Sequence, residues 1–453
     1  MKRAETLDVA EIIDRSPFGA LQMRAVGLCV LIGMLDGYDI QVIAVVAPAL
    51  SREWGVPVAA FGQVFGAGLV GLAVGALSLG PAGDRFGRKR TILLSTFIFG
   101  LFALLTAMSD TMRELTLFRF LTGLGLGGAM PNIITLTAEY SPKRLRATVI
   151  TIMFCGLPVG LMLGGLAGAG LLEVFGWRSL FVLGGATPLL LLPILAKWLP
   201  ESIRYLVMRN KAPAQVARTM RAIAPAAGFT SSDRFTINET PLEGLPVRLL
   251  FADGRALDTG LIWLAFFLNL LVMYFLVNWT PVLLMQLGFP QGTAIRSLAA
   301  LNLGGVVGAI VLGRLLDRPN PYPILTAAYA AAAGGILAVT ALNQSVAVTM
   351  LIIFVIGFGV IGAQIGMNAV TASLYPAAIR ATGVGWALGI GRFGSIIGPT
   401  LGGVFLAASL EPATIFSTSA VPAASAALAL LWLGRRQKAK LELDNASRQG
   451  DAP

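Results

Sequence analysis

Twelve long apolar runs constrain this chain more than any other feature of its sequence. A helix needs about 20 apolar residues to cross the hydrocarbon core of a bilayer. The runs lie at about 22–50, 59–82, 91–109, 112–138, 147–172, 177–199, 259–287, 291–313, 321–342, 346–373, 381–408 and 412–434. Only 13% of the 453 residues are charged, whereas a soluble domain carries about 25%. We therefore expect an all-α membrane protein with 12 transmembrane helices, which excludes soluble enzymes and nucleic-acid-binding proteins.

A polar stretch after the sixth run divides the chain into two halves. We expect a cytoplasmic N-terminal segment (1–21), a six-helix bundle (22–199), a cytoplasmic central loop (200–258), a second six-helix bundle (259–434) and a cytoplasmic tail (435–453). Of the 34 lysines and arginines, 28 fall on the side of the termini and the central loop, and 4 on the other. Because cytoplasmic loops carry the excess of basic residues, both termini are predicted to be cytoplasmic. The net charge of +11 is then explained by the orientation in the membrane, and we infer no nucleic-acid partner from it.

Two short motifs recur in both halves. Residues 80–85 (GPAGDR) follow the second run, and residues 313–318 (GRLLDR) follow the eighth. Arg146-Ala-Thr recurs as Arg380-Ala-Thr at nearly the same offset. Paired halves of this kind let transporters place one binding site near the membrane midplane, between two bundles that rock against each other. The repeat therefore predicts a transporter with two pseudo-symmetric bundles.

The first motif extends into a family signature. The run GPAGDRFGRKR at 80–90 resembles the loop between spans 2 and 3 of the major facilitator superfamily, and 139–146 and 200–204 resemble its other cytoplasmic motifs. The resemblance implies the major facilitator fold and a monomeric carrier. We expect a gating role for these loops, the alternative being a merely solvated basic loop. The expected gating residues are Asp84, Arg85, Gly87, Arg88, Glu139, Arg146, Asp317 and Arg318.

Two carboxylates lie inside the first apolar run. Asp36 and Asp39 are three residues apart and so share one face of a helix. A charge at the bilayer centre costs about 2.5–3.5 kcal/mol by insertion scales, and such residues are usually functional. Burial and a like-charged neighbour both favour the protonated carboxyl, and the chain has no histidine to carry a proton instead. We expect Asp36 and Asp39 to couple transport to protons. The alternative is that one of them only pairs with Arg119 in the fourth run.

The residues around these acids narrow the resemblance. Asp-Gly-Tyr-Asp at 36–39 and LDVAEIID at 7–14 are similar to the aromatic acid:proton symporter family, whose members carry hydroxybenzoates and related acids. Matched by position, the family implies proton coupling at Asp36 and Asp39 and functional arginines at Arg119 and Arg392. The resemblance does not identify which acid is carried.

The two arginines in apolar runs suit a carboxylate substrate. An aromatic acid with a pKa of about 4 is an anion at neutral pH, and a planar guanidinium binds both carboxylate oxygens. We expect Arg119 to be balanced by Asp36 or Asp39. Arg392 has no acid in the apolar runs of its half, so we expect it to bind the substrate carboxylate. The alternative is that Arg392 packs against backbone carbonyls in the glycine-rich helix at 385–403.

Aromatic and amide side chains in the apolar runs are candidates for contacts to a ring and its hydroxyls. Tryptophan and tyrosine near span ends more often anchor the membrane interface. The candidates are Tyr38, Tyr274, Trp279 and Trp386 for the ring, and Asn132, Asn269, Asn278, Gln364 and Asn368 for a hydroxyl.

These features together predict a proton-coupled symporter that takes up an aromatic carboxylate across the inner membrane by alternating access. Its partners are the acid, protons and the lipid bilayer. The two cysteines are far apart in sequence, so we expect no metal and no cofactor. The glycines at 123–128 lie within an apolar run and predict close helix packing. Alternatives are a carrier of another small organic anion such as a muconate-like diacid, an efflux pump and, more remotely, a membrane receptor for aromatic acids.

Overall fold

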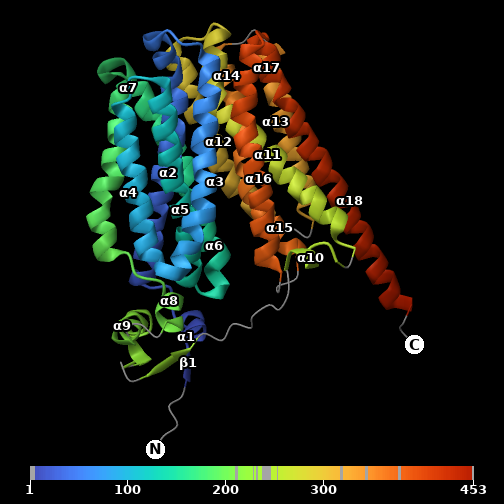
Figure 1. Cartoon of the computed structure of the whole chain (residues 1–453). Coiled ribbons are helices and arrows are strands. Elements are labelled where there is room, and N and C mark those ends of the chain that lie inside the picture. The colour runs from blue at the N-terminus through green and yellow to red at the C-terminus, as the bar shows by residue number, and fades with distance from the viewer. Residues whose placement is uncertain are drawn as a thin grey trace, which may run out of the picture. The chain divides into compact units, whose positions relative to one another are not determined.

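Figure 1 shows the computed structural model of the chain, which is almost entirely helical. The structure describes residues 6–209, 213–227, 229–230, 233–236, 246–252, 254–316, 320–341, 345–375 and 379–450. The chain separates into two compact units. The first unit comprises Met1–Val42 and Ala67–Pro241, and the second comprises Ile43–Gly66 and Leu242–Pro453.

The long helices follow the apolar runs closely. In the first half they are α2 (Ala20–Trp54), α3 (Phe61–Phe86), α4 (Arg88–Ala107), α5 (Met112–Glu139), α6 (Lys143–Phe154) and α7 (Gly156–Trp198). In the second half they are α11 (Ala256–Gln286), α12 (Gln291–Leu315), α13 (Tyr322–Ala341), α14 (Val346–Gly357), the π-helical turn η3 (Phe358–Gly362), α15 (Ala363–Leu374), α16 (Arg380–Ala407), α17 (Pro412–Thr418) and α18 (Ala420–Gly450).

Eleven segments among the described residues are long and apolar enough to cross a membrane. One of them, Lys143–Trp198, has 56 residues, more than twice the number that one crossing needs. Its helix α7 breaks at Gly176, where φ is 73° and ψ is 173°, outside the helical region. The segment therefore holds two spans, and the chain is an all-α membrane protein with the twelve spans that the sequence predicts.

Close backbone contacts hold the spans of the first unit together. A Cβ atom added at Gly71 in α3 would lie 2.0 Å from the carbonyl oxygen of Phe120 in α5, and one at Gly123 would lie 2.0 Å from that of Gly68. Only glycine allows the two helices to approach this closely. The glycines at 123–128 thus pack helices, as their sequence predicts.

A small layer of short elements lies at one end of the first unit (Figure 1). It contains α1 (Val9–Arg15), α8 (Ile203–Met208), α9 (Pro213–Ile223) and η2 (Pro225–Ala227). Buried apolar side chains of α1, α8 and α9 join one core. Strand β1 (Thr6–Asp8) pairs in parallel with β2 (Arg234–Thr236). These two strands are a departure from the purely helical prediction.

The second unit includes the segment at 43–66, which the sequence predicts as part of the first bundle. The 3₁₀ turn η1 (Val58–Ala60) and the start of α3 pack on α16. A Cβ at Gly62 would lie 3.1 Å from the Cα of Gly403. The approach of Gly62 to Gly403 is one of the contacts between 43–66 and the rest of the second unit.

Helices α11 and α16 form the tightest helix pair of the second unit. A Cβ at Gly394 would lie 2.1 Å from the carbonyl oxygen of Phe267, and one at Gly398 would lie 2.3 Å from that of Leu271. The short helix α10 (Pro246–Leu249) precedes α11. The pair brings Arg392 of α16 against the face of α11 that carries Tyr274.

Candidate functional site

A buried ion pair joins the first and fourth spans within the first unit. Arg119 of α5 donates from Nη1 to Oδ1 of Asp39 at 2.7 Å, and from Nη2 to Oδ2 at 2.8 Å. Both side chains are at most 6% exposed. Two parallel charge-assisted hydrogen bonds fix the planes of both groups. Asp39 is therefore the acid that balances Arg119, one of the two that the sequence left open.

Glycine places these acids at the centre of the unit. A Cβ at Gly37 would lie 2.0 Å from the carbonyl oxygen of Leu157, and one at Gly160 would lie 1.9 Å from that of Met34. Helix α2 therefore lies directly against α7 at the level of the two acids. Asp36 is 2% exposed. The glycine of the Asp-Gly-Tyr-Asp motif thus serves helix packing, while the motif's carboxylates are held inside the unit.

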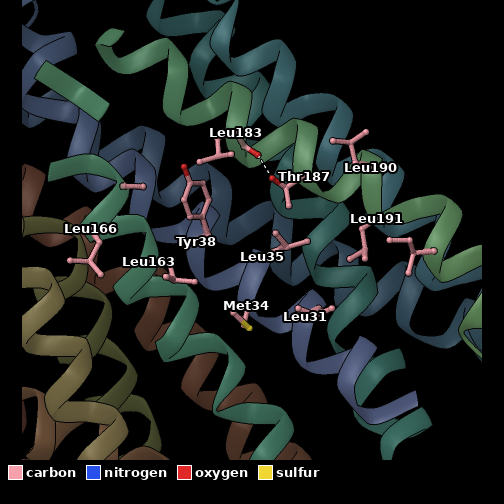
Figure 2. Close-up of a pocket in the computed structure, with 12 residues that line it drawn as sticks. Leu31, Met34, Leu35, Tyr38, Leu163, Leu166, Leu183, Thr187, Leu190 and Leu191 are labelled. Carbon is pink, nitrogen blue, oxygen red and sulfur yellow. Dashed lines mark hydrogen bonds between the residues drawn. The ribbon is translucent and has the colours of Figure 1, made fainter. Parts of the chain in front are cut away.

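Tyr38 faces α7 and lines an apolar pocket (Figure 2). Its hydroxyl donates to the carbonyl oxygen of Leu180 at 3.1 Å. Its ring lines a pocket of about 780 Å³ together with aliphatic side chains of α2 and α7, among them Leu35 and Leu183. Thr187 in this pocket donates to the carbonyl of Leu183. The pocket therefore offers no charged group to an acid, and Tyr38 is engaged by the packing of α2 on α7.

Arg392 forms a different kind of contact in the second unit. Its Nη1 lies 3.5 Å from the hydroxyl of Tyr274, and it forms no ion pair with any residue that the structure describes. Its side chain is partly exposed. A guanidinium beside a hydroxyl and without a carboxylate partner has hydrogen-bonding capacity left for an anion.

Four predicted amide residues also lie in the second unit. Asn269 of α11 donates from Nδ2 to Oε1 of Gln364 in α15. Asn368 lies one helical turn after Gln364. Asn278 donates instead to the carbonyl of Tyr274 in its own helix, at 2.7 Å. The structure therefore brings Asn269 and Gln364 together, whereas the Asn278 amide is hydrogen-bonded to the backbone of its own helix.

The two candidate tryptophans have other aromatic partners. Trp279 is fully buried, its indole donates to the carbonyl of Pro399 at 2.8 Å, and its ring meets the edge of Phe65. Trp386 stacks on Trp263 with ring centroids 5.7 Å apart, and it keeps 43% of its surface exposed. Trp279 thus serves packing here, and only Trp386 retains an open face.

Three of the predicted gating residues of the first unit, Asp84, Arg88 and Glu139, form one charged cluster. Arg88 donates to Asp84 at 2.8 Å and to Glu139 at 2.5 Å, and the Ser202 hydroxyl donates to the second oxygen of Glu139 at 2.7 Å. The Arg88 side chain is 7% exposed. The motifs at 80–90, 139–146 and 200–204 therefore meet in one network.

Glu201 closes this cluster around a turn. Its carboxylate accepts from the backbone N–H of Lys89 at 3.0 Å, and its carbonyl accepts from the Tyr140 hydroxyl at 2.8 Å. Burial raises the pKa of Tyr140 well above its usual range, so this hydroxyl stays protonated and donates. Gly87 has φ of 103°, and a Cβ there would lie 2.6 Å from the Glu201 carboxylate. Gly87 is therefore required both by its backbone conformation and by the space it leaves.

The remaining predicted residues make other contacts. Asn132 donates to the carbonyls of Leu79 and Gly128, so it ties α3 to α5. Arg85 lies over the ring of Phe86. Arg146 is half-buried in α6. Asp317 and Arg318 lie outside the described residues.

Sequence reasoning missed a second buried carboxylate cluster. Asp258, at the start of α11, is fully buried and accepts from Arg436 at 2.9 Å, Gln437 at 2.9 Å and Lys440 at 2.5 Å, all on α18. These partners are 178 to 182 positions away in sequence. The sequence shows one acid at 258 and several basic residues after 434. It does not show which of these basic residues pair with Asp258.

Charged side chains buried inside long apolar spans, in two units with related motifs, define a membrane transporter. The profile of the Major Facilitator Superfamily matches residues 29–399. The chain therefore belongs to the major facilitator superfamily and is a multi-pass membrane protein. It is a transporter and not an enzyme, as its sequence predicts.

Relatives place the chain among aromatic acid transporters of this superfamily. It is 42% identical over 427 residues to the gallate transporter of Pseudomonas putida, covering 94% of each chain. It is 39% identical over 434 residues to the 4-hydroxybenzoate transporter PcaK of Pseudomonas aeruginosa, covering 95% of this chain and 96% of that one. Both findings confirm the resemblance read from the sequence.

A solved structure confirms the fold. The partially occluded, inward-open xylose transporter XylE from E. coli matches with a TM-score of 0.67 over 90% of this chain and 97% of that one. The two sequences are 16% identical, so the likeness concerns the fold alone.

Proposed function

We propose that this protein is a proton-coupled symporter that takes up an aromatic carboxylate across the inner membrane by alternating access. The observation that carries the proposal is the contrast between two arginines of the spans, Arg119, which is buried, and Arg392, which is partly exposed. Arg119 has its carboxylate partner, Asp39, inside the first unit. Arg392 forms no ion pair with any described residue of the second unit, and the relatives transport aromatic acids.

Arg392 is the proposed carboxylate-binding residue. A guanidinium offers five N–H donors in a planar fork that fits a carboxylate. The Tyr274 hydroxyl, 3.5 Å from Nη1, can donate to the same anion. Trp386, with its exposed face, is the remaining candidate for contact with the ring.

Asp36 and Asp39 are the proposed proton-binding residues. As an anion, Asp39 is held by two hydrogen bonds to Arg119. Protonation would remove its charge and weaken that pair. Because Asp36 lies one turn away and is also buried, a proton on either acid reduces repulsion with the other. We propose that a proton in the first unit and a carboxylate in the second together permit the change of access.

The charged cluster around Arg88 is the proposed gating element. It joins the ends of α3, α4 and α5 with the segment that follows α7. The excess of basic residues on this side supports a cytoplasmic location for it and for both termini. The mechanism needs one chain only, and we propose that the protein acts as a monomer.

The test is uptake by purified protein in proteoliposomes. Labelled benzoate, hydroxybenzoates, protocatechuate, gentisate, gallate, muconate and a sugar are offered with an acid-outside pH gradient, which is then collapsed. We expect accumulation of an aromatic acid that is lost with the gradient. Accumulation that survives the collapse would contradict proton coupling, and preference for muconate would favour a diacid carrier. One proton per monoanion moves no net charge, whereas two would add about 2.3 kcal/mol per 100 mV of membrane potential.

A further inference from the structure

The apolar pocket that Tyr38 lines is a long groove between α2 and the two spans of α7 (Figure 2). Its volume is about 780 Å³. Along the sixth span its lining extends from Leu183 to Ile194, which is about 16.5 Å along the helix axis. This length is about half of the 30 Å hydrocarbon core, the share of one leaflet. The groove therefore has the length that an acyl chain occupies within a single leaflet.

The lining of the groove faces hydrocarbon. Leu190 is 74% exposed, Leu166 49% and Leu31 42%, and all three lie inside spans. Large exposed apolar side chains on a membrane protein mark surfaces that contact lipid. The hydroxyls of Tyr38 and Thr187, which also line the groove, both donate to backbone carbonyls. The groove is therefore suited to an apolar chain and not to an acid or to water.

Two basic side chains continue the two walls of the groove beyond the aliphatic lining. Arg24 precedes Leu31 by seven residues of α2, so the two share one helical face. Lys197 follows Ile194 by three residues of α7 and lies on the same face as it. Each wall of the groove therefore ends in a cation.

The start of α2 and the end of α7 are tied together by Tyr140. Gln22, two residues before Arg24, donates to the Tyr140 carbonyl at 2.9 Å. The Tyr140 hydroxyl donates to the carbonyl of Glu201, four residues after Lys197, at 2.8 Å. Both cations therefore lie at the same end of the groove. The excess of basic residues supports a cytoplasmic location for this end.

The charges of Arg24 and Lys197 are available to an anion. Both residues are exposed, and neither forms an ion pair within the described part of the chain. The Nζ of Lys197 lies 5.6 Å from the ring centroid of Trp198, a residue type that is enriched at the membrane interface. Long basic side chains near span ends reach toward the headgroups, where they attract anionic lipids.

We propose that the groove binds an anionic glycerophospholipid of the cytoplasmic leaflet. One acyl chain lies against the aliphatic walls, and the headgroup phosphate is bound by Arg24 and Lys197. The chain alone would be shared by every phospholipid, so the two cations provide the selectivity for an anionic headgroup. The site lies within the first unit, whereas Arg392, the proposed carboxylate-binding residue, belongs to the second.

Native mass spectrometry of the purified full-length protein in detergent tests the headgroup contact. The probes are phosphatidylglycerol and phosphatidylcholine with identical acyl chains, and the dissociation constant of the first bound lipid is measured for each. The test variant is Arg24→Gln/Lys197→Gln. The control is Arg218→Gln/Arg221→Gln, which removes the same charge from two exposed arginines of α9 in the same unit.

A second pair of variants tests the groove itself. Thr187→Trp places an indole among the lining side chains, at an exposed position that tolerates a larger residue. Val182→Trp is the control, because Val182 is an exposed residue of the same span and does not line the groove. Lipid-induced shifts of thermal unfolding provide an independent readout for all four variants.

In the wild type we expect the Kd for phosphatidylglycerol to be at least about 10-fold lower than for phosphatidylcholine, since each basic side chain near an anionic headgroup contributes about fivefold. In Arg24→Gln/Lys197→Gln this ratio should fall to about 1–3, and each single variant should give an intermediate ratio. Arg218→Gln/Arg221→Gln should keep the wild-type ratio. Thr187→Trp should raise the Kd for both lipids by about threefold or more through lost chain contacts, whereas Val182→Trp should not.

Four results would overturn the inference. One is a wild type that binds the two lipids equally well. Another is a wild-type ratio in Arg24→Gln/Lys197→Gln and in both of its single variants, and a third is an equal fall of the ratio in Arg218→Gln/Arg221→Gln. The fourth is equal lipid binding by Thr187→Trp and Val182→Trp, which would mean that the headgroup is bound without a chain in the groove.

Discussion

At the scale of single residues, Asp39 and Arg119 depend on each other. Replacing Asp39 with Asn leaves the Arg119 guanidinium buried beside a neutral amide. Breaking a buried ion pair from one side costs about 3–5 kcal/mol. We expect Asp39→Asn to lower the midpoint of thermal unfolding in detergent clearly. The double variant Asp39→Asn/Arg119→Gln should lose less than the sum of the two single variants, and strict additivity would show that the pair is not coupled.

Uptake distinguishes the proton role of the two acids from their structural role. Asp36→Asn leaves the Asp39–Arg119 pair in place and nearly preserves the size of the side chain. It should abolish accumulation against a gradient while substrate exchange across the membrane, which needs no net proton flux, continues. Proton-driven accumulation in both Asp36→Asn and Asp39→Asn would refute the coupling role.

Arg392 offers a test of carboxylate binding. Lysine keeps the positive charge but has no planar fork, and a bidentate site does not tolerate this exchange. We expect Arg392→Lys to raise KM for the acid by about 10-fold or more with unfolding unchanged, measured by initial uptake rates. Arg296→Lys is the matched control, because Arg296 is an exposed arginine of the same unit that contacts its own helix. A KM within twofold of wild type in Arg392→Lys would contradict the assignment.

The sequence identifies the buried charged residues of the site, but it does not identify their partners. Buried acids and arginines are rare in apolar spans, so Asp36, Asp39, Arg119 and Arg392 stand out without a structure. Which acid pairs with Arg119 could not be predicted, because both acids lie on one helical face. Aromatic residues such as Trp279 are common in spans, and only the fold shows that this indole is enclosed by Phe65 and Pro399.

At the scale of elements, glycine sets how closely the helices approach. A Cβ at Gly37 would lie 2.0 Å from a carbonyl of α7, whereas one at Gly27 in the same helix would meet nothing within 4 Å. We expect Gly37→Ala to destabilise the protein by about 3 kcal/mol, and Gly27→Ala to change stability by less than about 1 kcal/mol. Thermal unfolding in detergent and the folded fraction on gel filtration measure both. Equal stability of the two variants would refute the close α2–α7 contact.

The number of spans followed from hydropathy because a bilayer fixes their length. The break between the fifth and sixth spans lies at Gly176, between the apolar runs 147–172 and 177–199 that the sequence predicts. The three-residue strands β1 and β2 pair across more than 220 positions of sequence. Segments this short carry no periodic pattern, so their pairing lay beyond sequence reasoning.

At the scale of the whole molecule, the repeated motifs predicted two related halves, but not that 43–66 groups with the second unit. The repeat is a likeness between short sequence motifs, whereas the grouping depends on contacts between helices that are far apart in sequence. The contact at Gly62 and Gly403 involves residues over 300 positions apart. Local patterns carry no information on such contacts.

The C-terminal segment is held to the start of the seventh span through Asp258. A chain ending after Gly434 would lose Arg436, Gln437 and Lys440 and leave a fully buried carboxylate without these donors. We expect this truncation to cost about 3–5 kcal/mol, seen as a lower unfolding midpoint and less folded protein. A chain ending after Glu442 keeps all three partners and should match the full length.

The same truncation in an Asp258→Asn background should cost clearly less, because no buried charge remains to be balanced. Truncation after Gly434 with unchanged stability would contradict the role of Asp258. The pair of backgrounds also bears on the receptor alternative. Deleting the tail from the wild type could abolish a response simply by unfolding the protein. Signalling by the tail would be supported if the truncated Asp258→Asn protein still folds and transports but no longer gives the response.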